Sequence, residues 1–247
     1  MRLERFFDDF SAYLLGDLRR DELARALDPR STWSTRDLAG LSHYAIHARA
    51  QREHIAEVVF ERTSRMVVAH AGQATWSRLV DAYFRRHPQR TIAFSRNMQA
   101  FVGFVRARPR EVAPWVVDLA QLDWYAFVTV CAPVPLEDAS SAVTHLVPLH
   151  VVDYEHDVLS WLVRDEAGDA TEPPSRAPIT VAHARLPNLD LVHCALTPPQ
   201  ATLLRGLLTG CSGALEALST EAEAAWDALE SAGLLTSRRV GSGKVQS

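Results

Sequence analysis

Apolar residues recur at helical spacing through the first half of the chain. Spacings of three and four residues between Leu3 and Leu14 predict a helix over 3–15 that ends at Gly16. The same pattern predicts helices over 20–27, 35–71, 73–86 and 95–106, with Ser95 as the N-cap of the last. Gly72 and the pair His87–Pro88 end two of these helices, because glycine and proline interrupt helical hydrogen bonding.

The stretch Ala113–Ala132 predicts a buried helix. It begins with a proline in the first turn and is apolar over most of its circumference. The polar residues that remain form one narrow arc, made of Asp118, Gln121 and Tyr125. We expect this helix to be the last of an all-α unit.

Asp123 projects from the middle of the apolar face of this helix. A carboxylate there needs a partner, because burying an unpaired charge is costly. A structural pairing with an arginine such as Arg49 or Arg52 is one interpretation, and a general base is the other. No second catalytic group accompanies Asp123 in the sequence, which favours the structural role.

After Pro133 and Pro135 the periodicity changes from helical to alternating. This pattern predicts strands over His145–Tyr154, Asp157–Arg164, Ile179–Arg185 and Leu189–Leu196, with a polar, proline-rich loop over 165–178. Helices follow over 198–209, 213–218 and 220–232. Their end signals are Thr197 before Pro198, Gly210, a capping box of Thr220 with Glu223, and Gly233. Residues 234–240 predict a terminal strand or wing, and 241–247 a frayed end.

These elements predict an α+β protein of two domains. Residues 1–133 form an all-α helical domain, and residues 134–247 form a small module of β-strands and a winged helix. The 247 residues, 47% of them hydrophobic and 23% charged, suit such a globular chain. Residues 1–126 carry 19 Lys+Arg and 15 Asp+Glu, a net charge of +4, and the remainder carries 7 and 15, a net charge of −8. The acidic second half disfavours phosphate binding there.

Targeting signals and disulfide motifs are not recognisable in the sequence. The three cysteines share no close spacing, which favours a reducing compartment. The N-terminal residues are acidic and amphipathic rather than a signal sequence, and no apolar stretch reaches the length of a membrane span. We therefore expect a soluble, cytoplasmic protein without a membrane partner.

Histidines offer the most visible candidate chemistry. His43, His47 and His54 share one face of a predicted helix, where a pair at i, i+4 can chelate a metal, although a solvated face is the expected role. The histidines of the strand region, at positions 145, 150, 156, 183 and 193, have no ligand-like spacing and are expected at the surface or rim. Without a nucleotide fingerprint, triad or strong metal motif, the chain predicts neither a cofactor nor catalysis of its own.

A winged-helix module binds DNA through a helix or a peptide through an edge strand. The helix over 220–232 carries acidic residues and no basic one, so duplex phosphate would be repelled and nucleic acid is not expected. Peptide capture along 189–195 is the preferred interpretation, and a DNA-binding transcription regulator is the alternative. Leu229 is expected in the module's own core. The predicted peptide-binding residues are Leu189, Asp190, Leu191, Val192, His193 and Trp226.

Three landmarks resemble the HvfC/BufC-like family, often labelled putative DNA-binding proteins, to which MbnC and TglI are related. They are Tyr83 with His87–Pro88, Phe101 with Phe104–Val105, and the run Leu119–Trp124, and the later segment YEHDVLSWL also resembles the family. The resemblance spans roughly residues 40–235. It implies a partner subunit that forms a heterodimer with a multinuclear non-heme iron oxidase, a TIM barrel. That complex would modify ribosomally made precursor peptides, commonly at cysteine, with the iron held by the partner enzyme and the leader recognised here.

Overall fold

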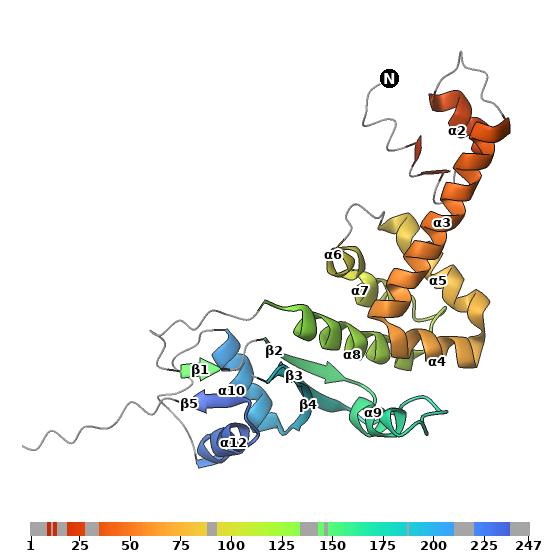
Figure 1. Ribbon diagram of the computed structural model, residues 1–247. Coiled ribbons are helices and arrows are strands. Elements are labelled where there is room, and N and C mark those ends of the chain that lie inside the picture. Colours follow the sequence, from red (N-terminus) through yellow and green to blue (C-terminus); the bar gives the residue numbers. More distant parts are fainter. Residues whose placement is uncertain are drawn as a thin grey trace, which may run out of the picture. The chain divides into compact units, whose positions relative to one another are not determined.

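A computed structural model describes residues 9–10, 12–13, 19–27, 35–87, 93–133, 143–145, 148–186, 188–209 and 220–237 of the chain. The described residues are mostly helical and include a small antiparallel sheet, which confirms the α+β class (Figure 1). The chain packs as two compact units, residues 1–116 and 117–247. This division falls inside a helix, whereas the change of periodicity places it after residue 133.

The first unit consists of helices. Residues 9–10 and 12–13 are helical, and the rest of the helix predicted over 3–15 lies outside the described residues. The predictions for 20–27 and 73–86 are confirmed by α2 and α5. The helices that follow residue 19 are α2 (Arg20–Leu27), α3 (Thr35–Val59), α4 (Glu61–Ala71), α5 (Gln73–Arg86), α6 (Phe94–Met98) and α7 (Phe101–Arg106).

Two of the predicted helices are each divided in the structure. The run over 35–71 breaks at Phe60, whose backbone leaves the helical region at φ −121° and ψ 50°. The break buries the Phe60 ring completely, with its centroid 4.4 Å from that of Phe101. The run over 95–106 breaks at residues 99–100, and Ala93 rather than Ser95 occupies the N-cap of α6. Tertiary packing of aromatic rings therefore overrides continuous helical periodicity here.

Aromatic side chains form the centre of this unit. Tyr83 packs edge-on against Phe84, Phe101 and Phe104, with ring centroids 5.2 to 5.3 Å apart. Its hydroxyl donates to the carbonyl of Asn97, close to the break between α6 and α7. Burial raises the pKa of Tyr83 to about 12, so the hydroxyl stays protonated and remains a donor.

The predicted buried helix is α8 (Pro114–Cys131), and from residue 117 onward it belongs to the second unit. That unit also contains β1 (Val143–His145), β2 (Leu149–Tyr154), α9 (Val158–Glu166), β3 (Ile179–Arg185), β4 (Leu191–Leu196), α10 (Pro198–Leu208), α12 (Thr220–Ser231) and β5 (Leu235–Ser237). β2, β3 and β4 form an antiparallel sheet in that order, and β1 pairs with β5. The strand predicted over 179–185 is confirmed at both ends.

The strand predicted over Asp157–Arg164 is wrong, because this segment is the helix α9. Asp157 caps it by accepting a hydrogen bond from the Ser160 N–H at 3.0 Å. Val158, Trp161 and Leu162 are buried at helical spacing. The cap and the i, i+3, i+4 pattern favour a helix despite the β-branched residues. The predicted strand from 145 to 154 is likewise two strands, since β1 ends at His145 and β2 begins at Leu149.

One face of the sheet packs on the terminal helices. Ala182, Ala184 and Leu196 join Leu203, Leu204, Leu229, Leu234 and Leu235 in a single apolar core. Thr197 precedes α10 as predicted, and its N–H donates to Gln200 Oε1 at 2.8 Å. Gly233 ends α12 with φ +70°, where the Leu234 N–H donates to the carbonyl of Leu229 at 2.9 Å. Residues 210–219 and 238–247, with the predicted 213–218 helix, lie outside the described residues.

Candidate functional site

β4 forms one edge of the three-stranded sheet, and its register shows which backbone groups face outward. The N–H of Leu186 donates to the carbonyl of Asp190 at 2.8 Å, just before β4. Opposite residues of an antiparallel pair alternate between bonded and outward-facing positions. The β3–β4 register therefore turns the N–H and C=O groups of Leu191, His193 and Ala195 away from β3. Among the described residues, no further strand pairs with this edge.

The six predicted peptide-binding residues occupy three different environments. Leu189 and Asp190 lie in the exposed turn before β4, where Leu189 adopts φ +74°. Leu191, Val192 and His193 are half-buried in β4 itself. Trp226 lies on α12, half-buried.

Side-chain direction divides this set further. Val192 and Trp226 both pack against the apolar core, whereas Leu191 and His193 point to the opposite face of the sheet. Leu229 is buried in the core, as expected. The strand that can offer backbone groups to a peptide is thus 191–195, shorter than the predicted 189–195.

The other edge of the sheet is capped by a side chain. Gln121 of α8 donates from Nε2 to the carbonyl of Asp153 at 2.8 Å. The carboxylate of Asp153 accepts from Arg205 and from Thr180, both at 2.7 Å, and these hydrogen bonds hold its pKa below the ordinary value. β2 is therefore tied to α8 and α10 at Asp153, whereas Ala195 of β4 is exposed.

Three histidines lie in register across the sheet on the face that α8 covers. His150 is opposite His183 in the β2–β3 pair, and His183 is opposite His193 in the β3–β4 pair. The Nδ1 atoms of His183 and His193 are 2.8 Å apart, and Nε2 of His183 is 2.7 Å from the Tyr154 hydroxyl. Tyr125 of α8 stacks on His183 with ring centroids 5.8 Å apart.

Burial keeps the centre of this row neutral. His183 is 0% exposed, and burial lowers its pKa from 6.5 to about 3, with the nearby His193 and His150 acting in the same direction. Burial also lowers the pKa of His150. A neutral imidazole has one N–H, so His183 donates through one nitrogen and accepts through the other. Tyr154 and His193 must therefore take opposite roles, which makes the three residues a directional hydrogen-bonded chain.

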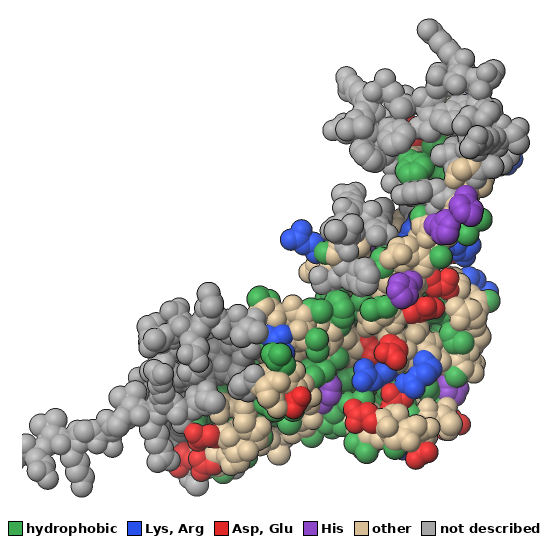
Figure 2. All heavy atoms as spheres, in the orientation of Figure 1, with side chains coloured by type: hydrophobic (Ala, Val, Ile, Leu, Met, Phe, Trp, Pro, Cys, Tyr) green, Lys and Arg blue, Asp and Glu red, His purple; other side chains and the backbone are tan. Residues whose placement is uncertain are grey.

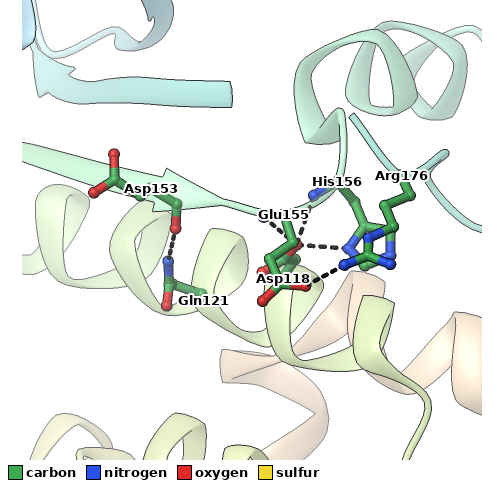
Figure 3. A network of polar contacts seen from close by, with 6 residues as sticks. All are labelled: Asp118, Gln121, Asp153, Glu155, His156 and Arg176. Carbon is green, nitrogen blue, oxygen red and sulfur yellow. Dashed lines mark hydrogen bonds and ion pairs between the residues drawn. The ribbon is translucent and has the colours of Figure 1, made fainter. Parts of the chain in front are cut away.

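A second polar group joins α8 to the segment after β2 (Figure 3). One oxygen of Asp118, Oδ2, accepts from the backbone N–H groups of Glu155 and His156 at 2.9 Å each. The same oxygen lies 2.7 Å from Nδ1 of His156. Asp118 is 5% exposed and His156 is 7% exposed. The polar arc of α8 is thus a buried connection to the sheet rather than a solvated stripe.

The expectation that the strand-region histidines lie at the surface or rim is wrong for His156 and His183, which are buried. His150 and His193 are half-buried, which agrees with a position at the rim. Spacing along the chain could not reveal the row, because its members come from three strands. In the sequence, the polar arc of α8 was the feature that indicated buried polar groups in this region, because polar residues on a buried helix need hydrogen-bond partners.

Asp123 is buried as predicted, at 3% exposure. Of the two arginines suggested for it, Arg49 forms an ion pair with Asp81 of α5. Arg52 is buried too, and its guanidinium lies 5.9 Å from the Phe84 ring centroid. The charge of Asp123 helps to raise the pKa of Tyr154, after burial and the charges of Tyr125 and Asp118.

His43, His47 and His54 are exposed on α3, as expected of a solvated face, and Figure 2 shows histidine side chains along that helix. The Nε2 atoms of His43 and His47 are 3.0 Å apart. Within the described part of the chain, no three His, Cys, Asp or Glu residues form a group suited to a metal ion.

The remaining polar features concern α12 and the cysteines. Glu223, Asp227 and Glu230 are exposed on α12, so its solvent-facing side is acidic. Cys131 and Cys194 are free thiols, and burial raises the pKa of Cys194, which disfavours its thiolate. None of the described helices has the length and apolar character that crossing a membrane requires.

The chain matches no family model, and no curated protein is significantly similar to it.

Proposed function

We propose that this protein is a non-catalytic partner subunit that binds the leader of a ribosomally made precursor peptide by strand addition to β4. It would present that peptide to a multinuclear non-heme iron oxidase, which holds the iron and modifies the peptide, at cysteine in our proposal. The resemblance to the HvfC/BufC-like family suggests this partner, and the spacing of the three cysteines suggests a cytoplasmic setting.

The outward-facing backbone of β4 carries the proposal. Leu191, His193 and Ala195 offer alternating N–H and C=O groups, which are the contacts that an added antiparallel strand uses. Ala195 is exposed, so a peptide backbone can approach at that point. The opposite edge has its Asp153 carbonyl occupied by Gln121, which favours β4.

The C-terminal elements support a winged-helix-like module. α10, α12 and β5 follow one another, and β5 pairs with β1 from before the sheet. The acidic side of α12 suits a basic leader better than duplex DNA. The net charge of −8 over residues 127–247 also favours a basic leader over duplex DNA. Residues 1–126, with a net charge of +4, would supply contact with the oxidase.

Substitution of Ala195 tests the peptide site. Ala195→Pro removes one outward N–H and places a ring in the path of an added strand, yet proline is tolerated at sheet edges. Ala195→Val is the matched control, since it keeps the N–H and suits a strand. With a fluorescein-labelled peptide encoded beside the gene, we expect the anisotropy-derived Kd to rise at least about tenfold for the proline variant only. Equal affinity of both variants would refute strand addition at β4.

Two further measurements separate the proposed function from its alternative. Co-expression with a neighbouring iron-oxidase reading frame should yield a stable complex, and the peptide should bind that complex more tightly than this chain alone. A transcription regulator would instead shift duplex DNA in a gel, with affinity falling steeply as salt rises. We expect no such shift.

A further inference from the structure

A cavity of about 600 Å³ lies within the first unit. Residues of α4 and α5 and the segment 111–116 line it. Small-molecule sites typically enclose about 300–1,000 Å³. All of the residues that line the cavity precede residue 117, so none of them belongs to the proposed peptide site on β4.

The interior of the cavity is apolar. Val67, Leu79 and Val116 line it with exposures of 4%, 8% and 3%. Val112, just before α8, and Trp115, in its first turn, are half-buried and complete the apolar lining. Binding is favourable when a ligand's hydrocarbon body displaces water from such a surface. The lining therefore calls for a ligand with an apolar body.

The rim of the cavity is cationic. Arg78 and Arg85 are both lining residues, exposed, and seven residues apart on α5. This spacing puts them on one face of the helix, roughly 10 Å apart along its axis. Glu111 also lines the cavity, but the Nε atom of Arg108 lies 3.6 Å from its carboxylate. The acidic charge at the rim is thus countered by Arg108, and Arg78 adds a positive charge there.

We propose that this cavity binds a small anionic amphiphile, with one carboxylate at the arginine rim and a hydrocarbon body among the apolar side chains. Guanidinium groups bind carboxylates through charge-assisted hydrogen bonds. Arg78 already donates to Thr75 Oγ1 at 3.2 Å, so its guanidinium is directed along the cavity wall that Thr75 shares. The class of ligand follows from this pairing of an apolar interior with cationic groups at its mouth.

Calorimetric titration of the full chain with three eight-carbon probes tests the charge requirement. Octanoate, 1-octanol and octylammonium share the same hydrocarbon body and differ in the head group. We expect octanoate to bind at least about tenfold more tightly than octanol, and octylammonium to bind more weakly still. Equal binding of octanoate and octanol would overturn the proposal, as would no heat with octanoate.

Variants of α5 locate the site. Arg78→Ala combined with Arg85→Ala should weaken octanoate at least about tenfold, while Arg86→Ala, an exposed arginine outside the lining, should change it less than about twofold. Ala82→Phe should abolish binding by filling the space beside the half-buried Ala82. Circular dichroism confirms that each variant is folded, and Ala82→Leu provides a smaller filler if the phenylalanine variant is not.

Other outcomes assign the cavity differently. Unchanged octanoate affinity in the filled variants would place the ligand elsewhere and overturn the proposal. Loss of oxidase binding in those variants, with no octanoate binding by the original chain, would show a protein-docking groove instead. Neither result depends on leader affinity, so this proposal and the peptide site can fail independently.

Discussion

The three histidines of α3 and the three histidines of the sheet differ in how the chain brings them together. His43 and His47 are four residues apart on one helix, and both side chains remain in solvent. His150, His183 and His193 are separated by 33 and 10 residues, yet strand pairing aligns them in one row. The row includes a fully buried ring.

The difference shows what spacing can and cannot reveal. Helical neighbours follow from the sequence alone, because a helix has a constant number of residues per turn. Neighbours across a sheet follow from the register, which depends on turns and on the face that packs on the core. The sheet histidines are buried or half-buried, whereas the α3 histidines are exposed, so we expect substitution to have the larger effect in the sheet.

The largest expected effect is a loss of stability at acidic pH that depends on His183. Its folded pKa of about 3 is below the unfolded value, so the unfolded chain binds the proton more readily between the two values. The stabilisation that neutral His183 gives the folded state is fully present above about pH 6.5. The free energy of unfolding then falls by up to about 4 kcal/mol as the pH approaches 3. Urea unfolding from pH 4 to 7, followed by tryptophan fluorescence, measures it.

One variant isolates the histidine in that measurement. His183→Gln should flatten the dependence of the unfolding free energy on pH, because the glutamine side chain does not titrate. Equal dependence in the original chain and in His183→Gln would contradict the buried, neutral assignment.

Asp118→Ala should lower the free energy of unfolding by about 3 kcal/mol. It removes an oxygen that accepts from two backbone N–H groups and contacts Nδ1 of His156, all within a buried environment. Denaturant titration at pH 7 gives the value. Asp118→Asn keeps one acceptor oxygen, so its free energy of unfolding should lie between those of the original chain and Asp118→Ala. If Asp118→Ala lost no more stability than a variant that lacks an exposed carboxylate, the connection would be dispensable.

The smallest effect is expected on α3. His47→Ala should change the unfolding free energy by less than about 0.5 kcal/mol in metal-free buffer, because both of the paired histidines there are exposed. The same titration, run beside Asp118→Ala, measures the contrast. A loss of unfolding free energy comparable to that of Asp118→Ala would show that the exposed face of α3 contributes to the stability of the fold.

Local signals determined much of the secondary structure. Helices α2 and α5 and strand β3 have the predicted ends, and α8 begins and ends within one residue of its predicted span. Gly233 ends α12 with a positive φ, and Thr197 stands before α10 as predicted. These features rest on contacts between residues a few positions apart, which the sequence displays directly.

The errors have a common cause. Asp157–Arg164 is a helix rather than a strand, since the Asp157 cap and the buried Trp161 outweigh β-branched residues. Phe60 interrupts a helical run because its ring packs beside Phe101, far along the chain. In each case an aromatic side chain is fully buried and its packing outweighs local propensity, and at Asp157 a local cap acts in the same direction.

The candidate site divides in the same way. The sequence by itself determined the α+β class, the strand near residues 191–196 and the acidic character of α12. Only the tertiary structure decided that β4 is an edge, that the backbone groups of Leu191, His193 and Ala195 face outward, and that Asp118 and His183 are buried. Helix and strand periods are properties of the chain, whereas register and burial arise when distant segments compete for the same core.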